Sequence, residues 1–494
     1  MAATQDGPAG LSRRQMMASG ALATIAALAG DRARAAASPL HRGRGASAPP
    51  RLRMDTTADL TTVLAQSPLP PFVPVTANPG DVTVSAQQVY QPFLGVGAAL
   101  TDSAAYVLTH YMTAAQRRAL LTDLYSPSGR NWQMLRVCMG SPDFRSEKTG
   151  YTYDDGTVNT SLSRFSVAKD TAFITPVIQE ILAINPAVKV LATPWTPPAW
   201  MLASGSFEHG GCTFNNSYKS PYAQYFLKFI QAYQSMGIPI WAVTAQNEAV
   251  GGWFLSLSQA KETNFIGAHL GPALASAGLG NVKIFAMDDQ WSNASYGQAV
   301  YTANSAHPYT AGIAYHGYRG SPVAMSSAYG EQHLTEWRSK VTESLAITMA
   351  GMAGGYVAGG VSNWARSVIL WNLALDQNGA PNQNKPDRRG VVTVNNQTGA
   401  VTQNPEYYAL AHLAMFAQPG ALRCLSPSYG PAYVAYQTYP SDITTTALVN
   451  PDGSVVLYVY NGAASAKTFQ IIDTSTSTGC TVSMTPGELS TFVW

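Results

Sequence analysis

The chain has 494 residues, of which 46% are hydrophobic and only 12% are charged. Its 30 Lys and Arg residues nearly balance its 28 Asp and Glu residues, so it lacks the basic surface on which nucleic-acid binding depends. The ten Trp, 25 Tyr and 15 Phe residues supply a large core and exclude intrinsic disorder. No uninterrupted apolar run reaches the length of a bilayer span, so we expect a large globular protein without integral membrane association.

The N-terminus has the pattern of an export signal. Arg13-Arg14 precedes a mildly apolar, alanine-rich run over residues 18–30, and Ala33-Arg34-Ala35 has the small residues that a signal peptidase requires. Paired arginines ahead of such a run resemble a bacterial twin-arginine signal. We therefore expect residues 1–35 to be a twin-arginine signal peptide and residues 36–53 a disordered leader. The mature protein would then be secreted, to the periplasm or the extracellular space.

The four cysteines are too few and too scattered for a disulfide framework in a chain of this length. No Cys-x-x-Cys pair occurs, which excludes a thiolate zinc site of the usual spacing. Cys138 lies in an apolar run and is interpreted as a buried thiol. Cys424 and Cys480 both fall in the C-terminal region and could form a disulfide after export, which the sequence leaves undecided.

Eight short apolar runs alternate with longer helical patterns through the middle of the chain. Several runs are continuously apolar, as strands buried on both faces are. The runs cover residues 93–100, 133–140, 187–195, 239–248, 282–289, 311–318, 331–337 and 367–375. The clearest helical patterns cover residues 103–124, 169–184, 220–236, 258–277 and 341–357. Eight such repeats over roughly 300 residues favour a (β/α)8 barrel over a doubly wound sheet, in which six parallel strands are more usual.

The pattern changes towards the C-terminus, where short strand-like segments are separated by Asn, Pro, Asp and Gly turns. These segments are residues 443–448, 454–460, 467–472 and 489–493. Residues 82–85, ahead of the barrel, also look like a strand. We therefore expect an α/β fold in which a TIM barrel over residues 93–418 carries an all-β sandwich built from residues 54–92 and 419–494.

The ends of the apolar runs carry the candidate chemistry, because catalytic groups of such barrels lie at the C-terminal ends of the strands. Glu248 ends the fourth run and Glu336 lies at the end of the seventh. A glutamate in a loop is usually a solvated acid or a salt-bridge partner, but one that ends a barrel strand is placed for a site. Glycoside hydrolysis needs two such acids, one to protonate the leaving oxygen and one to attack or stabilise the anomeric carbon.

Other strand-end residues have a structural alternative. Asp143 suits a helix cap as well as a site, and His316 suits a satisfied core position as well as a site. Asp288 and Asp289 suggest a metal, but no third ligand with fitting spacing is evident, so we interpret them as structural or as the substrate edge. No HExxH, GxSxG or Walker motif occurs, and we expect neither a metal nor an organic cofactor.

Several multi-residue motifs, in the right order from about residue 80 to the C-terminus, resemble glycoside hydrolase family 30. That is the family of lysosomal glucosylceramidase and of bacterial and fungal β-glycanases. The motifs are Gly95-x-Gly97-x-x-Leu100-Thr101-Asp102-Ser103-Ala104, Arg136-x-x-Met139-Gly140-Ser141-Pro142-Asp143-Phe144, Pro194-Trp195-Thr196-x-Pro198-x-Trp200, Trp241-Ala242-Val243-Thr244-Ala245-Gln246-Asn247-Glu248, Asp288-Asp289-Gln290, Trp371-Asn372-Leu373-Ala374-Leu375 and Leu448-x-Asn450-Pro451-Asp452-Gly453-Ser454.

The resemblance implies retaining hydrolysis of β-glycosides by a barrel with an attached sandwich. It assigns Glu248 as acid/base and Glu336 as nucleophile, with Asn247 holding the sugar 2-hydroxyl. It also implies that Arg136 supports the nucleophile. Arg136, His316 and Tyr318 would together orient Glu336 and keep its carboxylate ionised. The substrate-binding residues that it implies are Asp143, Trp195, Asn247, His316, Tyr318 and Trp371.

The sequence departs from the family pattern at Ala249, Gly317, Trp337 and residues 383–386, all of which bear on the leaving-group side. Together with the export signal, the resemblance implies a secreted, glucosylceramidase-like enzyme that takes a β-glucoside, glycan or glycolipid. An endo-β-1,6-glucanase and an exo-acting β-xylosidase or β-fucosidase stay open within the family. A carbohydrate-binding protein without catalysis is the alternative from another class, and the presence of both glutamates argues against it. The sequence does not indicate an oligomeric state.

Overall fold

The computed structural model describes residues 51–494 apart from 208–211, 252–253, 384 and 386. The predicted signal peptide and most of the predicted leader lie outside the described residues. The first strand, β1 (Leu52–Thr56), already includes residues 52 and 53, so the predicted end of the leader at residue 53 is wrong. Arg53 pairs with Asp55 and Glu488, which ties this segment to the last strand region of the chain.

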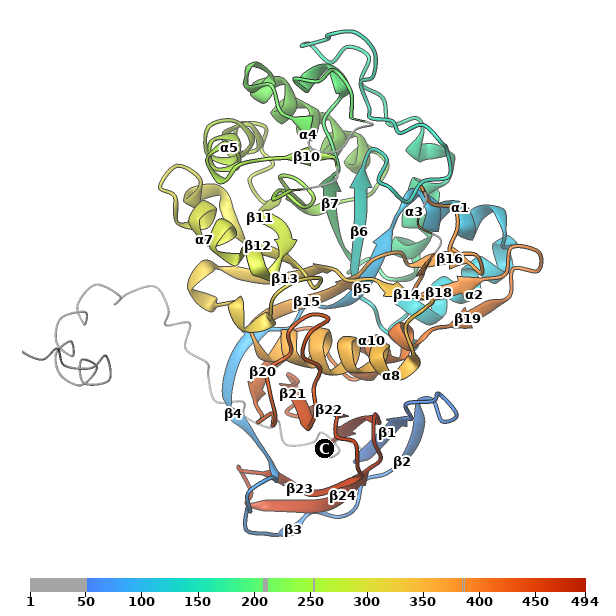
Figure 1. Cartoon of the computed structure of the whole chain (residues 1–494), viewed down its shortest axis with the longest axis vertical. Helices are drawn as coiled ribbons and strands as arrows, with labels where there is room; N and C mark the ends of the chain where they lie inside the picture. Colours follow the sequence, from blue (N-terminus) through green and yellow to red (C-terminus); the bar gives the residue numbers. More distant parts are fainter. Residues whose placement is uncertain (1–50, 208–211, 252–253, 384, 386) are drawn as a thin grey trace, which may run out of the picture. The chain divides into compact units, whose positions relative to one another are not determined.

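Eight parallel strands close into a barrel in the order β11-β12-β13-β15-β5-β6-β7-β9 (Figure 1). They are β5 (Gly95–Leu100), β6 (Met134–Met139), β7 (Lys189–Pro194), β9 (Ile240–Thr244), β11 (Lys283–Gln290), β12 (Thr310–His316), β13 (Glu331–Glu336) and β15 (Ala365–Leu370). Each overlaps one predicted apolar run, which confirms the barrel. One layer of its interior is a buried cluster of Met134, Leu191, Ala242, Phe285, Ala314 and Ile369, contributed by six strands.

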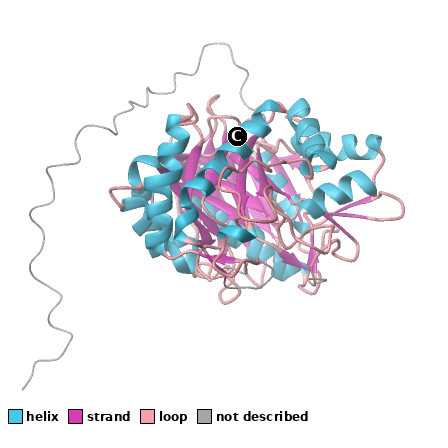
Figure 2. Ribbon diagram, turned by 90° about the horizontal axis from the view of Figure 1, so that it is seen from above, coloured by secondary structure: helices cyan, strands magenta, loops and turns pink. Residues whose placement is uncertain are grey.

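Helices surround the barrel, as the view from above shows (Figure 2). They are α1 (Asp102–His110), α2 (Ala114–Tyr125), α3 (Ile174–Ile184), α4 (Lys219–Ser235), α5 (Gln259–Phe265), α6 (Gly271–Ser276), α7 (Ala294–Thr302), α8 (Leu345–Met349), α9 (Gly360–Ser362) and α10 (Pro405–Ala414). The helix predicted over residues 103–124 is in fact two. Thr113 and Gln116 form a reciprocal capping box that starts α2, so the chain breaks between α1 and α2.

An apolar helix, Leu345–Ser362, is built from α8, the π-helical segment η9 (Ala350–Gly359) and α9, and it contacts strands of the sandwich. Its length and mean hydropathy of 1.3 would suit a membrane span, but 72% of that window is buried inside the fold. A Cβ at Gly354 would lie 2.7 Å from Pro440, and one at Gly355 would lie 2.6 Å from the Tyr433 ring. Glycine therefore lets loops of the sandwich region pack directly on the helix backbone.

The sandwich joins both ends of the described chain, as predicted. Its strand order is β2-β1-β25-β22-β21-β20-β4-β23-β24-β3. Besides β1, these are β2 (Ala65–Pro68), β3 (Val73–Pro74), β4 (Val82–Pro92), β20 (Leu422–Leu425), β21 (Ile443–Val449), β22 (Val455–Asn461), β23 (Lys467–Asp473), β24 (Thr478–Met484) and β25 (Leu489–Val493). The short strands elsewhere are β8 (Cys212–Thr213), β10 (Leu255–Ser256), β14 (Ser339–Lys340), β16 (Ala374–Asp376), β17 (Arg388–Arg389), β18 (Val392–Val394) and β19 (Val401–Gln403).

All four cysteines are buried, and none of them forms a disulfide. This confirms the buried thiol at Cys138 and corrects the disulfide left open between Cys424 and Cys480. Cys424 lies on β20 and Cys480 on β24, and strands β4 and β23 separate these two in the hydrogen-bonded order. Burial raises the pKa of Cys424 to about 12 and that of Cys480 to about 11, so neither thiol is activated.

Candidate active site

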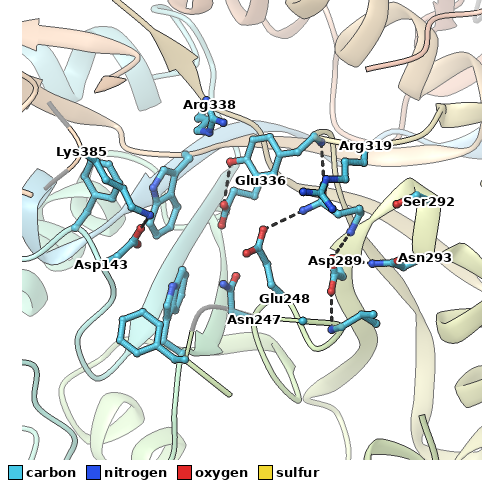
Figure 3. Close-up of a pocket in the computed structure, with 18 of the residues that line it drawn as sticks. Asp143, Asn247, Glu248, Asp289, Ser292, Asn293, Arg319, Glu336, Arg338 and Lys385 are labelled. Atoms are coloured by element: carbon cyan, nitrogen blue, oxygen red, sulfur yellow. Dashed lines mark hydrogen bonds and ion pairs between the residues drawn. The ribbon is translucent and has the colours of Figure 1, made fainter. Parts of the chain in front are cut away.

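A cavity of about 590 Å³ is lined by residues at the C-terminal ends of the barrel strands. Glu248 and Glu336 project into it from opposite walls and face each other (Figure 3). One carboxylate oxygen of each glutamate and one ring nitrogen of His316 all lie within 4.8 Å of one another. The Glu336 side chain is only 8% exposed, whereas that of Glu248 is 29% exposed.

The structure brings all predicted site residues to this end of the barrel. Those that line the cavity are Asp143, Trp195, Asn247, Glu248, Tyr318, Glu336 and Trp371. The other two, Arg136 and His316, are fully buried and contact the two glutamates from within the barrel. Asp143 thus lines the cavity and His316 contacts Glu248 and Asp288, so both lie at the site that the sequence suggested for them.

Arg136, on β6, links three other strand ends. Its Nη1 donates to Glu336 Oε2 at 2.5 Å, while its Nη2 donates to Asn247 Oδ1 at 2.7 Å and to Asp288 Oδ2 at 2.9 Å. A guanidinium presents several donors in a fixed planar fork, which explains how one side chain orients three acceptors. The predicted support of Glu336 by Arg136 is thus present as a direct ion pair.

Asp288, on β11, is the centre of the buried network. Besides Arg136, its carboxylate accepts hydrogen bonds from His316 Nε2 at 3.2 Å and from the hydroxyls of Thr193 at 3.1 Å, Thr244 at 2.8 Å and Thr335 at 2.6 Å. Burial alone would raise the pKa of Asp288, but the charge of Arg136 and the bond from His316 outweigh it and hold that pKa well below its usual range.

Sequence analysis missed this central role of Asp288. The available signal was an acid near the end of the fifth apolar run, together with threonines towards the ends of the third, fourth and seventh runs. Three hydroxyl donors at the same end of a barrel favour a shared buried acceptor. Asp289, in contrast, accepts the backbone N–H groups of Val250 and Gln290 at the pocket edge, and burial raises its pKa to about 6.

His316, on β12, bridges Asp288 and Glu248. Its Nδ1 lies 3.2 Å from Glu248 Oε1, and its Nε2 lies 3.2 Å from Asp288 Oδ1. Burial would lower the pKa of His316, but the surrounding carboxylates, Glu336 first, raise it to about 10. At neutral pH the imidazole is therefore protonated and donates from both nitrogens. The spacing of this site would also suit a metal ion, but His316 and Arg136 already supply its positive charge.

The two glutamates differ in their surroundings. Burial favours the neutral form of both, but the hydrogen bond and charge of His316 outweigh burial at Glu248, so its pKa is lowered. At Glu336 burial outweighs the charges of His316 and Arg136, so its pKa is raised. Tyr318 Oη also donates to Glu336 Oε1 at 2.9 Å. Groups this close exchange protons, so the cluster titrates as a unit.

A pair of stacked tryptophans and an ion pair also line the cavity. The rings of Trp195 and Trp371 stack with centroids 5.1 Å apart and planes at 25°. Lys385 pairs with Asp143 across the pocket rim, and both are on the same side of the glutamates in Figure 3. On the other side Figure 3 places Asp289 and a further polar set, Ser292, Asn293 and Arg319. Sequence analysis did not predict Lys385 as a site residue.

Comparison with known proteins finds relatives over most of the described chain. The model of the glycosyl hydrolase family 30 TIM-barrel domain matches residues 93–355, and that of the family 30 beta sandwich domain matches residues 432–488. An endo-1,6-beta-D-glucanase of Neurospora crassa is 33% identical over 67% of this chain and 72% of its own length. The lysosomal acid glucosylceramidase of Mus musculus is 28% identical over 84% of this chain and 83% of its own. A solved endo-β1,6-glucanase superimposes with a TM-score of 0.79 at 29% identity, covering 90% of this chain and 99% of its own.

Proposed function

The chain belongs to glycosyl hydrolase family 30, and from that premise we propose that it hydrolyses β-glucosidic bonds with retention of configuration. The family makes it an O-glycosyl hydrolase. Its first proposed substrate is β-1,6-glucan, which is the substrate named for two relatives at 33% and 30% identity and for a solved neighbour.

The spacing of the two carboxylates carries the proposal of retention. Retaining glycosidases hold their two carboxyl groups about 5–5.5 Å apart, whereas inverting enzymes keep about 6.5–9.5 Å to admit a water molecule. An oxygen of Glu248 lies within 4.8 Å of an oxygen of Glu336. A gap this short is in keeping with the retaining class and supports direct attack by one carboxylate on the anomeric carbon.

Glu336 suits the role of nucleophile. Arg136 and Tyr318 each donate to one of its oxygens, which fixes the carboxylate in one orientation. When Glu336 attacks the anomeric carbon, the bond to the leaving oxygen breaks and a glycosyl-enzyme ester forms. Both donors stay in place to stabilise the carboxylate when it is released in the second step.

Glu248 suits the role of acid and then base. Its carboxylate contacts His316 Nδ1 at 3.2 Å, so a proton is held between the two groups and is available to the leaving oxygen. In the second step Glu248 takes a proton from water as the water attacks the glycosyl-enzyme, which restores the starting state. No metal or organic cofactor enters either step.

The walls of the pocket fit a glucosyl unit. The stacked Trp195 and Trp371 offer an apolar face for the C–H side of a pyranose, and Asp143 offers an acceptor for hydroxyls far from the anomeric carbon. Asn247 accepts from Arg136 through Oδ1, which leaves its amide N–H groups to donate to the 2-hydroxyl. That bond strengthens as the oxocarbenium charge develops.

The leaving-group side favours a sugar over a lipid. Opposite Asp143 the pocket is lined by Asp289, Ser292, Asn293 and Arg319, all of which bind hydroxyls better than acyl chains. Glucosylceramide is the second candidate, because relatives named glucosylceramidases match 69–84% of the chain at 25–30% identity. We also propose that residues 1–35 direct export, which places the enzyme where a glucan polymer is found.

Release of reducing sugar from β-1,6-glucan, an aryl β-glucoside and detergent-dispersed glucosylceramide tests the proposal. We expect oligosaccharides from the glucan, with the β-anomer formed first in a proton NMR time course. Glu336→Gln should be inactive on every substrate. The matched control is Glu331→Gln, at the other end of the same strand β13, where Glu331 pairs with Lys283 and Arg366. An α-anomer formed first, or turnover by Glu336→Gln, contradicts the mechanism.

A further inference from the structure

A second buried glutamate lies behind the site. Glu262, on α5, has no exposed surface and does not line the cavity. Its Oε1 accepts the backbone N–H of Met287 at 2.8 Å, and its Oε2 accepts the hydroxyl of Tyr296, on α7, at 2.7 Å. Within the described part of the chain no Lys, Arg or His forms an ion pair with it. A buried carboxyl group without a cation is costly, so its two hydrogen bonds must hold something in place.

They hold a bulge in β11. Met287 and Asp288 have φ angles of +74° and +51°, and the pairing of β11 with β12 shifts register between Met287 and Asp289. A bulge takes a residue out of the ladder and leaves its N–H without a strand partner. Here the N–H of Met287 donates to Glu262. Two successive residues with positive φ are strained, so this conformation persists only where neighbouring groups fix it.

The α7 helix presses on the same bulge from outside. A Cβ at Gly297 would lie 3.2 Å from the Met287 side chain and 2.8 Å from Ile313, so the helix approaches as closely as glycine allows. Tyr296, the neighbour of Gly297, supplies the second hydrogen bond to Glu262. Glu262 therefore joins α5, α7 and the bulge at one buried point.

The bulge connects directly to the reacting groups. The Asp288 carbonyl accepts the backbone N–H of Glu248 at 2.9 Å, and Glu248 itself has a φ of +47°. The Asp288 carboxylate holds Arg136 and His316, which in turn contact Glu336 and Glu248. A change in the backbone at Met287 would therefore move both carboxylates of the site.

We propose that Glu262 is a positioning residue for glycoside hydrolysis. By accepting the Met287 N–H, in an orientation that the Tyr296 hydroxyl fixes, it locks the bulge that aims Asp288 at Arg136 and His316 and that anchors the backbone of Glu248. The inference rests on the roles proposed above for Glu248 and Glu336. Glu262 acts only through Asp288, since it does not reach the cavity.

The test compares Glu262→Leu with Glu262→Gln and Tyr296→Phe on an aryl β-glucoside. Glu262→Leu removes both hydrogen bonds, and we expect kcat to fall about 10- to 100-fold with KM changed less than about threefold, since a misplacement near 1 Å costs about that much. Glu262→Gln keeps an acceptor for Met287 and should recover most of kcat. Tyr296→Phe, which leaves the Met287 bond, should lose about three- to tenfold. If Glu262→Leu fails to fold, the Tyr296→Phe variant still tests the proposal.

Asp170→Asn is the matched control. Asp170 is another buried carboxyl group that accepts hydrogen bonds from the hydroxyls of Tyr151, Tyr153 and Tyr233, and among the described residues it bonds to neither the bulge nor the two glutamates of the cavity. The Asp170→Asn substitution should lower the melting temperature of the protein and leave kcat unchanged. A Glu262→Leu or Tyr296→Phe protein that is folded and has wild-type kcat overturns the proposal.

The connection from Glu262 through Asp288 to His316 can also be measured without turnover. The pKa of His316 is determined by NMR, with His316→Asn used to assign its signal. In the wild type the imidazole should stay protonated to about pH 10, whereas in Glu262→Leu it should lose its proton at a lower pH because Asp288 no longer faces it. An unchanged titration overturns the positioning role. A wild type that cleaves no glucoside overturns the proposed function instead, and the titration still decides on Glu262.

Discussion

Replacing Asp288 by Asn removes one negative charge from the buried network and leaves its shape almost unchanged. The substitution leaves Arg136 with Glu336 as its remaining ion-pair partner, and it deprives His316 of its bond to a charged acceptor. Three threonine hydroxyls also lose a charged acceptor. We expect Asp288→Asn to be markedly less stable than the wild type and to have a lower His316 pKa.

The magnitude follows from the contact distance. Two unit charges at the 2.9 Å that separates Arg136 Nη2 from Asp288 Oδ2 interact by about 6 kcal/mol at an effective dielectric constant of about 20. Part of this is recovered, because Arg136 keeps Glu336. Breaking buried pairs typically costs about 3–5 kcal/mol, and we expect that range here. For a protein of this size such a loss corresponds to a decrease in melting temperature of about 3–5 °C.

Urea unfolding of Asp288→Asn and of the adjacent variant Asp289→Asn from pH 3 to pH 8 measures the effect. The pKa of Asp288 lies below its unfolded value, so its contribution is present above about pH 4 and is lost as the pH falls further. The pKa of Asp289 is raised to about 6, so its charge destabilises the fold as the pH rises through that value.

The two variants should therefore respond in opposite directions. Asp289→Asn should be as stable as the wild type at pH 8 or more stable, by up to about 3 kcal/mol. The difference in unfolding free energy between the wild type and Asp288→Asn should become smaller below pH 4. Equal deficits for both variants at pH 8, or a deficit of Asp288→Asn that does not change with pH, would refute the electrostatic reasoning.

Three further outcomes are expected. Gly317→Ala should lower the unfolding free energy by about 1–3 kcal/mol in urea, because its Cβ would lie 2.6 Å from both Trp337 and Tyr356. Four thiols should react with a thiol reagent in denaturant without prior reduction, and none in the native state, since all four cysteines are buried and none of them forms a disulfide. The alkaline limb of kcat should lie at higher pH than that of kcat/KM, because bound sugar covers the exposed 29% of Glu248 and raises its pKa.

The barrel was predictable because its strands are buried on both faces and so form continuous apolar runs. The sandwich was predictable only in part. β24 alternates exposed Thr and Ser with buried residues and has little apolar content, so it escaped notice although it pairs with β23 over seven residues. The division between α1 and α2 depended on the capping box at Thr113, which is a local polar signal inside a helical pattern.

The acids of the site were predictable from position, because Glu336 ends β13 and Glu248 follows the end of β9 by four residues. The hydrogen bonds and charges around these acids were not predictable from the sequence. The bonds to Asp288 come from residues up to 152 positions away in the chain, and the bulge that aims Asp288 inward has no pattern of its own. Lys385 reaches Asp143 from 242 residues along the chain. Such contacts exist only after the barrel closes, so position relative to the strand ends pointed to the two carboxylates of the cavity and left their support undetermined.

For the mechanism proposed above, the charges in the buried cluster explain how one site could hold both a nucleophile and an acid. Arg136 and His316 carry two positive charges, and Asp288 with Glu336 offsets them. Glu248 is the third carboxylate beside these two positive charges and the more exposed of the two glutamates, and in the free enzyme its contact with His316 keeps its pKa low. A bound sugar removes that solvent contact, which favours transfer of the shared proton from His316 to Glu248. The acid is then formed when there is a leaving group to receive its proton.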